Sequence, residues 1–504
     1  MINLNKINDL FLNNEESSFI KDFSNPVNNK FGSTFFIQCT NDYFYLKLYS
    51  ILLRQEAKNI RNVVGLVIIP FKSSKWEKIF ILPFMVKVIL NLLRIRKIKK
   101  LYKSIGVNEF YTLYSINIIT RTINLLKTFL IVNKIKSKTD ALNLNIDGVR
   151  CGDLICDTSV RFSDDPNLKI KSFNFLFTLY EALNYLYLDK IICNNFSFSN
   201  AFLNQAVFTH HGIHARYFLN KNIDVYTSGH FPLFKKLSIE DPSMMSSKFR
   251  HQQLLKRNNL DEKIIQESFE NFGKRFDGED DLGIIKHFTS NPYHKKNMNL
   301  HNKSEDYEGV LFLHNFYDSH KLYGTTVFID FVEWARFTLN LINDFKLNIA
   351  IKPHPLQSRE SEEYVKKLQK EFNDLKWIDP KTSNLEIFKK GILYGISQHG
   401  TVLGELAYHG IKPICCSENP LSAYDICYEA KSAEEYKNFI ATAKSLPEKE
   451  NVNRSLGLYY YNHYKMESDF ILKSSLINGI NIANTNRYNF TSKDLLLKEI
   501  ITYE

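Results

Sequence analysis

Residues 391–416 read GILYGISQHGTVLGELAYHGIKPICC, and this stretch decides the fold. Apolar runs typical of buried strands cover 391–396 and 412–416, and helical periodicity covers 401–408 between them. Gly410 stands where the helix would stop. A strand, a helix and a strand joined by short loops predict two parallel neighbours in an α/β sheet.

The same alternation extends upstream of this unit. Strand patterns at 309–313 and 347–352 alternate with helical patterns at 327–342 and 358–372. Ser358 is placed to cap the second of these helices. We therefore expect a doubly wound parallel sheet, in which ligands bind beyond the carboxyl ends of the strands.

The first half of the chain starts in the same way. Strands are expected at 34–39 and 63–70, with a helix at 43–55, and later strands at 111–119 and 190–193. A polar, charged stretch with few apolar runs then interrupts the pattern. The expected fold class is α/β, with two Rossmann-like domains facing a central cleft. The expected parts are a first domain at 1–240, a helical linker at 241–305, a second domain at 306–470 and a helical tail at 471–504 that is a candidate to pack on the first domain.

The composition is that of a soluble globular enzyme. The 504 residues are 44% hydrophobic and 24% charged, which excludes a disordered chain, a collagen-like fibre and a disulfide scaffold. Lys and Arg number 65 and Asp and Glu 54, so the net charge is +11 and anionic partners are favoured. The seven cysteines form no CxxC pair, and no apolar run reaches the length of a membrane span, so we expect a cytoplasmic protein with reduced thiols.

The strand at 347–352 ends in Lys352-Pro353-His354-Pro355. The two prolines hold the backbone extended and present His354 with little conformational freedom. His354 is then a candidate to hold a phosphate or a departing nucleotide, and Lys352 adds positive charge. The alternative is a proline-rich strand exit with an incidental histidine.

The strand at 391–396 is followed by a second candidate anion site. Gly400 permits close approach of the backbone, and Thr401 lies at the helix start, where free N–H groups can bind phosphate. Glu405, one turn later, is a candidate to bind a ribose or sugar hydroxyl. Ordinary cap and helix-dipole chemistry is the alternative for both Thr401 and Glu405.

A third polar loop follows the strand at 309–313. It carries His314, Asp318, His320 and Lys321, and this clustering predicts a ligand-facing loop. A metal site made by the two histidines and the aspartate is the rival interpretation, but the spacing matches no zinc signature. We rank nucleotide contact above metal binding.

The first half carries two further clusters. Asp153 and Asp157 are candidates for a general base on an acceptor hydroxyl, with turn and cap chemistry as the alternative. The candidates for binding an anionic acceptor are Arg161, His210, His211 and Arg216. A hydrogen-bonded surface cluster is the alternative for the histidines.

Together, residues 352–355 and 399–413 resemble the C-terminal half of bacterial capsule and lipopolysaccharide glycosyltransferases of the GT-B architecture. The His-Pro pair is similar to the motif with which sialyltransferases, Kdo transferases and teichoic-acid polymerases hold a cytidine nucleotide, and residues 152–161 look like an N-domain pattern of such enzymes. The acidic pair followed by glycine, where sialyltransferases place their base, has no clean match. The donor-binding residues implied are Lys352, His354, Pro355, Ser397, His399, Gly400, Thr401, Glu405, His314, Asp318, His320 and Lys321.

The resemblance implies a glycosyltransferase that moves a sugar from a nucleotide donor to a capsule or lipopolysaccharide glycan. A CMP-linked acid sugar, such as Kdo or a sialic-type sugar, is the leading donor, and neither a metal nor a cofactor is expected. One alternative is a CDP-polyol phosphotransferase of the teichoic-acid type. The other is a non-catalytic nucleotide-binding scaffold with a degenerate transferase fold.

Residues 80–106 combine helical apolar spacing with a dense run of Lys and Arg. Such a helix suits the inner face of the cytoplasmic membrane, where a lipid-linked acceptor would be met. An ordinary amphipathic helix with a solvated basic face is the interpretation that we favour slightly. Nucleic acid is not expected as a partner, because no recognised nucleic-acid module accompanies the charge.

Overall fold

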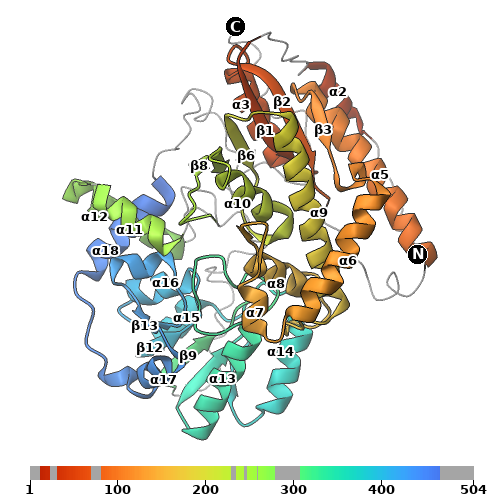
Figure 1. Cartoon of the computed structure of the whole chain (residues 1–504). Helices are drawn as coiled ribbons and strands as arrows, with labels where there is room; N and C mark the ends of the chain where they lie inside the picture. Colours follow the sequence, from red (N-terminus) through yellow and green to blue (C-terminus); the bar gives the residue numbers. More distant parts are fainter. Residues whose placement is uncertain are drawn as a thin grey trace.

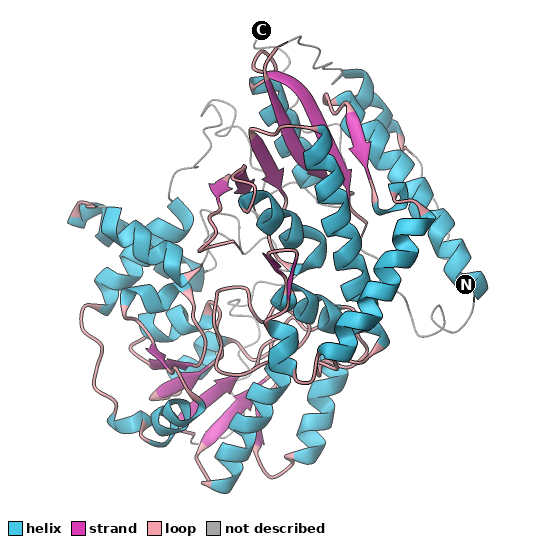
Figure 2. Ribbon diagram, viewed as in Figure 1, coloured by secondary structure: helices cyan, strands magenta, loops and turns pink. Residues whose placement is uncertain are grey.

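The computed structural model describes residues 12–22, 31–69, 81–228, 234–242, 247–257, 259–277 and 307–465. Two α/β domains follow one another along the chain, the first drawn from red to olive and the second from green to blue in Figure 1. Figure 2 shows a group of strands in each domain with helices around it.

The first domain is built on a six-stranded sheet of order β3-β2-β1-β6-β7-β8. All neighbours are parallel except β7 and β8. The central strand is buried because its apolar residues Phe36 and Ile37 meet helices on both faces of the sheet. The strands are β1 (Ser33–Cys39), β2 (Ile60–Val67), β3 (Glu109–Tyr111), β6 (Asn200–Leu203), β7 (Asp224–Thr227) and β8 (Lys235–Lys236).

Side-chain caps begin most helices of this domain. Asp42 accepts from the Phe44 N–H at 3.0 Å, and Ser172 accepts from the Phe175 N–H at 3.2 Å. The helices are α2 (Asn14–Asp22), α3 (Tyr43–Gln55), α5 (Ile81–Ser104), α6 (Ile118–Lys134), α7 (Lys138–Leu142), α8 (Gly152–Arg161), α9 (Phe173–Asn195) and α10 (Ile213–Leu219). A 3₁₀ turn (Leu113–Ser115), a π-helical turn (Phe208–Gly212) and a small hairpin, β4 (Asn145–Ile146) with β5 (Val149–Arg150), complete it.

Two strand predictions in this domain are wrong. Residues 190–193 lie inside α9, since a short apolar run cannot be distinguished by its periodicity from part of a buried helix. Of 111–119, only Tyr111 belongs to a strand. Thr112 and Asn117 cap a 3₁₀ turn and α6, which end the extended backbone there.

The second domain is built on a fully parallel six-stranded sheet of order β11-β10-β9-β12-β13-β14. Four strands match the alternation expected from the sequence. The strands are β9 (Gly309–Phe312), β10 (Ile349–Lys352), β11 (Lys376–Trp377), β12 (Tyr394–Ile396), β13 (Lys412–Cys415) and β14 (Tyr428–Glu429).

The helices of this domain alternate with its strands. Ser358 caps α14 as predicted, accepting from the Ser361 N–H at 3.2 Å. The helices are α13 (Phe331–Asp344), α14 (Arg359–Glu371), α15 (Asn384–Lys389), α16 (Val402–Tyr408), α17 (Ala433–Ala441) and α18 (Val452–Tyr460). Short 3₁₀ and π-helical turns lie at Lys274–Asp277, Pro420–Tyr424, Ala443–Ser445 and Tyr461–Lys465.

The described part of the expected linker holds α11 (Lys248–Arg257) and α12 (Glu262–Gly273). Helix α12 packs on α18 so closely that a Cβ on Gly457 would meet the carbonyl oxygen of Ile265. The three boundaries between the four expected parts stay predictions, and the expected tail at 471–504 lies outside the described residues.

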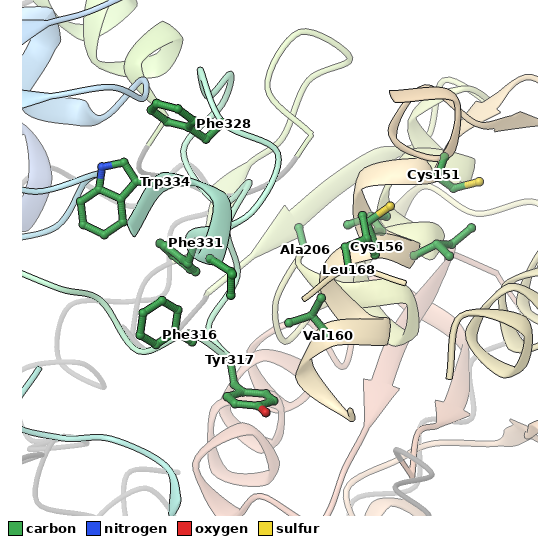
Figure 3. Close-up of a cluster of buried hydrophobic side chains, with 14 of the residues drawn as sticks. Cys151, Cys156, Val160, Leu168, Ala206, Phe316, Tyr317, Phe328, Phe331 and Trp334 are labelled. Carbon is green, nitrogen blue, oxygen red and sulfur yellow. The ribbon is translucent and has the colours of Figure 1, made fainter. Parts of the chain in front are cut away.

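One hydrophobic cluster runs through both domains. Figure 3 shows side chains of the second domain, such as Phe316 and Phe331, beside Cys156 and Val160 of α8. The loop that follows β9 contacts α8, so the carboxyl edges of the two sheets face one another. The predicted α/β class is confirmed, with two Rossmann-like domains that are each built on a mainly parallel sheet.

Candidate functional site

Three loops converge at the carboxyl edge of the second sheet. His314 follows β9, His354 follows β10 and His399 follows β12, which are neighbouring strands. The ring centroid of His314 lies 5.8 Å from that of His354 and 4.7 Å from that of His399. Phe331 stacks on His314 with centroids 4.7 Å apart. The structure thus brings together the three loops that the sequence singled out in this domain.

His399 is the least satisfied polar side chain of this cluster. It is 2% exposed, and within the described ranges neither ring nitrogen has a hydrogen-bond partner. Its neighbours include the rings of Tyr323 and Phe331, at centroid distances of 5.1 and 5.4 Å. Burial lowers the pKa of His399 well below its usual value, so the ring is neutral. A buried polar group without a partner costs about 1–3 kcal/mol, so its retention points to a polar ligand.

His354 offers a second imidazole donor. Its Nδ1 lies 3.1 Å from the Leu356 N–H and 3.0 Å from the Leu356 carbonyl oxygen, so this nitrogen is held by Leu356 while Nε2 has no such contact with it. Burial and the neighbouring His314 lower the pKa of His354 to about 4. Pro355, the last residue of the motif, is exposed.

His320 lies behind this cluster, edge-on to Phe331. The Gln398 side-chain amide contacts its Nε2, while Nδ1 is buried without a partner among the described residues. Burial lowers the pKa of His320 well below its usual value, and Lys321 adds to the effect. His320 therefore also has hydrogen-bonding capacity left over.

Lys352 and Glu405 lie beneath the loops. Burial lowers the pKa of Lys352 to about 8, although the nearby Glu405 carboxylate opposes this. The Lys352 Nζ donates to the Pro380 carbonyl at 3.4 Å, and Glu405 accepts from the Asn384 amide at 2.9 Å. Both side chains are buried, so water screens their charges only weakly.

The β12 loop exposes backbone at Gly400. Gly400 has φ +115°, which favours glycine, and a Cβ there would meet nothing within 4 Å. Thr401 is exposed at the start of α16, but its side chain makes no cap hydrogen bond, and the helix has only seven residues. Ser397 is buried, with Oγ 3.2 Å from the Phe312 carbonyl, so it ties this loop to β9.

The loop after β9 is held by α8 of the first domain. Asp157 accepts from the Ser319 hydroxyl at 2.7 Å and from the Lys321 N–H at 3.1 Å. Burial raises the pKa of Asp157 to about 6, although these two hydrogen bonds favour the carboxylate and lower it. Arg161 donates to the Tyr317 carbonyl at 2.9 Å, and Asp318 is exposed.

Asp330 joins the domains a second time. Its Oδ1 accepts from the Glu333 N–H at 2.8 Å and so caps α13. Its Oδ2 accepts from the Lys138 ammonium at 3.0 Å and from the Leu168 N–H at 3.4 Å, both in the first domain. A cavity of about 10 Å³ lies here, with Asp157, His320 and Phe331 in its wall. That volume holds about one water molecule, so a larger ligand must widen it.

Asp153 and Arg216, predicted for different roles, pair with each other. Two hydrogen bonds of 2.6 Å join the guanidinium to the carboxylate, and the pair is largely buried. Burial alone would raise the pKa of Asp153, but Arg216 holds it below its usual value. Asp153 is held by a cation, whereas Asp157 is held only by a hydroxyl and a backbone N–H, so Asp157 is the better candidate for a base.

His210 and His211 lie on the π-helical turn that follows β6. His211 Nδ1 lies 2.8 Å from the Gln38 amide oxygen, at the end of β1. His210 stacks on Phe208, and burial lowers the pKa of His210 to about 3. The carboxyl edge of the first sheet therefore also carries imidazoles, and their acceptor-binding role stays a prediction.

The sequence analysis missed several residues of these edges. His214 and Asp189 form a fully buried pair at 2.7 Å beneath the π-helical turn. Phe331 and Tyr323 wall the histidine cluster. Only Phe331 carried a local signal, because it begins a helix directly after the capping residue Asp330.

Neither a metal-binding cluster nor a membrane-spanning helix is present among the described residues. Over those parts of the chain, no group of three His, Cys, Asp or Glu side chains is arranged to hold a metal ion. Likewise, none of the described helices is long and apolar enough to cross a membrane.

Comparison with known proteins gives structural matches alone. No family model and no curated sequence matches this chain. MnaA of S. aureus, solved with UDP, is 10% identical over 87% of this chain and 100% of its own, with a TM-score of 0.28. UDP-GlcNAc 2-epimerase from Neisseria meningitidis bound to UDP-GlcNAc is 11% identical over 92% and 98%, with a TM-score of 0.24. HepE from Anabaena in complex with UDP and glucose is 8% identical over 85% and 93%, with a TM-score of 0.27. At such scores the ligands of those proteins are not transferred to this chain.

Proposed function

We propose that this protein is a glycosyltransferase that moves a sugar from a nucleotide-activated donor to a bacterial capsule or lipopolysaccharide glycan. The observation that carries the proposal is the convergence of His314, His354 and His399 at the carboxyl edge of the second sheet, with His399 buried and unbonded. Ligands of doubly wound sheets bind at this edge. Unused imidazole donors there suit phosphate oxygens.

The donor side would work by electrostatic stabilisation. Negative charge develops on the phosphate as the bond from sugar to phosphate breaks, and the N–H groups of His354 and His399 would meet it. Lys352, at the end of β10, would add a positive charge. The open space at Gly400 would let the phosphate come close to the backbone.

On the acceptor side, Asp157 is the proposed base. Burial raises its pKa to about 6, which suits proton exchange near neutral pH. The acceptor O–H would give its proton to the Asp157 carboxylate as the new glycosidic bond forms and the electron pair of the broken bond goes to the phosphate. The Ser319 and Lys321 donors would have to release Asp157 first.

The leading donor is a CMP-linked acid sugar such as Kdo or a sialic-type sugar. The resemblance of residues 352–355 to a cytidine-binding motif and the net charge of +11 support this choice.

The test is a titration of CMP, CDP and UDP against the wild type and His354→Ala, followed by a donor-sugar screen with product analysis. His409→Ala is the matched control, because His409 is an exposed histidine at the other end of α16. Wild type and control should bind CMP alike, and His354→Ala should bind about tenfold more weakly.

The other results of the titration and of the product analysis distinguish the alternatives. Binding of UDP without CMP removes the donor proposal and leaves the transferase proposal. A phosphodiester in the product supports the polyol-phosphate alternative, and nucleotide binding without any turnover supports the scaffold. Absence of nucleotide binding contradicts the proposed function altogether.

A further inference from the structure

Helix α6 turns large apolar side chains toward solvent. Six of them are between 47 and 75% exposed, and they are Ile118, Ile119, Ile123, Leu126, Phe129 and Leu130. The helix runs along the outer side of the first domain, against α9 (Figure 1). Scattered apolar residues on a surface are ordinary, but a set on one helix face indicates an interaction site.

The packed face of α6 buries two polar side chains beside the apolar Val132. Asn124 is buried and donates to the Asn184 side-chain oxygen of α9 at 3.0 Å. Thr128 is also buried and donates to the Asn124 carbonyl at 2.8 Å. A helix on the surface of a soluble domain normally has the opposite arrangement, with its apolar stripe toward the core. The apolar face of α6 therefore needs an apolar partner that the described residues of the domain do not supply.

The charge around this face selects the kind of partner. Helix α6 carries Arg121, Lys127 and Lys134 and no acidic residue. Helix α5 also contains Lys and Arg but no Asp or Glu. Two copies of this chain meeting through α6 would bring like charges together, which opposes a symmetric dimer. Exposed apolar side chains on a helix whose charged residues are all basic match an anionic lipid surface.

We propose that α6 docks this protein on the surface of an anionic lipid bilayer, with its apolar face among the head groups. This differs from the membrane surface considered at 80–106. The second half of α5 packs in the core through Ile95, Ile98 and Leu101, and Lys97 pairs with buried Glu16 at 2.8 Å. The proposal is independent of the enzymatic activity.

The experiment is co-sedimentation of the full chain with vesicles of phosphatidylcholine alone or mixed with phosphatidylglycerol. Wild type should bind the mixed vesicles and bind pure phosphatidylcholine much more weakly. The double variant Leu126→Ser with Leu130→Ser should lose about tenfold or more in affinity. Lys127→Gln with Lys134→Gln should reduce the preference for anionic vesicles.

A matched control is available on other surfaces. Ile239 and Leu393 are 61 and 47% exposed and lie outside α6, so Ile239→Ser with Leu393→Ser should bind vesicles like the wild type. The proposal is overturned if wild type binds no anionic vesicles, or if the α6 double variant binds as tightly as wild type. A wild-type dimer in solution that the α6 variant dissociates would also overturn it, in favour of a second copy.

Discussion

The carboxyl edges of the two sheets carry similar side chains but use them differently. In the first domain, His214 is paired with Asp189, His211 with Gln38 and Arg216 with Asp153, although His214 Nε2 and Arg216 Nε have no partner among the described residues. In the second domain, His399 is equally buried, yet neither of its ring nitrogens meets a described polar group. Side chains whose hydrogen bonds are made within the domain stabilise the fold, while those left unbonded are the candidates for ligand contact.

The largest expected effect tests whether the bonded side chains of the first domain stabilise the fold. Asp153→Ala leaves the buried Arg216 guanidinium without its carboxylate, so it should lower the free energy of unfolding of the first domain by about 3–5 kcal/mol. Urea unfolding measures this. Glu262→Ala, which breaks the exposed pair with Arg454, is the control and should change it by less than about 1 kcal/mol. Unchanged stability with loss of transfer would instead make Asp153 catalytic.

A second test concerns Asp157, which lies between the two edges. Its folded pKa of about 6 is above the unfolded value, so its stabilising contribution is complete below the unfolded pKa and is lost as pH rises through 6. Wild type should lose roughly 2–3 kcal/mol of stability by this route between acidic and neutral pH. Asp157→Asn should flatten that dependence in urea unfolding at several pH values. An identical pH profile in the variant would contradict the assignment.

The third test asks whether the unbonded His399 of the second domain contacts a ligand. His399→Phe keeps an aromatic ring beside Phe331 and Tyr323 but removes the unbonded nitrogens. The second domain should become about 1–2 kcal/mol more stable, while nucleotide affinity falls. Thermal unfolding and a nucleotide titration on the same variant measure both. Reduced stability with unchanged affinity would mean that His399 serves the fold.

The smallest expected effect is on the pH dependence of nucleotide binding. Burial keeps the imidazoles of His354 and His399 neutral in the free protein, and a bound phosphate would raise their pKa values. Affinity should therefore increase as pH falls, by at most about tenfold per pH unit for each imidazole that takes up a proton. His354→Ala should lower this slope in calorimetric titrations. A slope of zero in the wild type would exclude proton uptake.

Local sequence patterns predicted much of the fold. Apolar runs located β1, β2, β9, β10, β12 and β13, and the cap at Ser358 located α14. The approach of His354 and His399 to His314 of the β9 loop followed from parallel topology, since β10 and β12 both neighbour β9 and their carboxyl ends share one edge.

What the sequence could not predict depends on contacts between distant residues. Asp153 and Arg216 are 63 positions apart, and no periodicity indicates that they form a pair. The same holds for Asp189 with His214, and for the hydrogen bond from Asn124 of α6 to Asn184 of α9. Whether a candidate side chain is bonded or unbonded is a property of the folded chain, so the separation of structural from ligand-binding residues could not be made beforehand.

The two carboxylate oxygens of Asp330 make different contacts, one within the second domain and one with the first domain. One oxygen starts α13 within its own domain, while the other alone reaches across to Lys138 and Leu168. Releasing the second oxygen leaves the first in place. Loss of the contacts that Asp330 makes with the first domain would therefore leave the start of α13 capped.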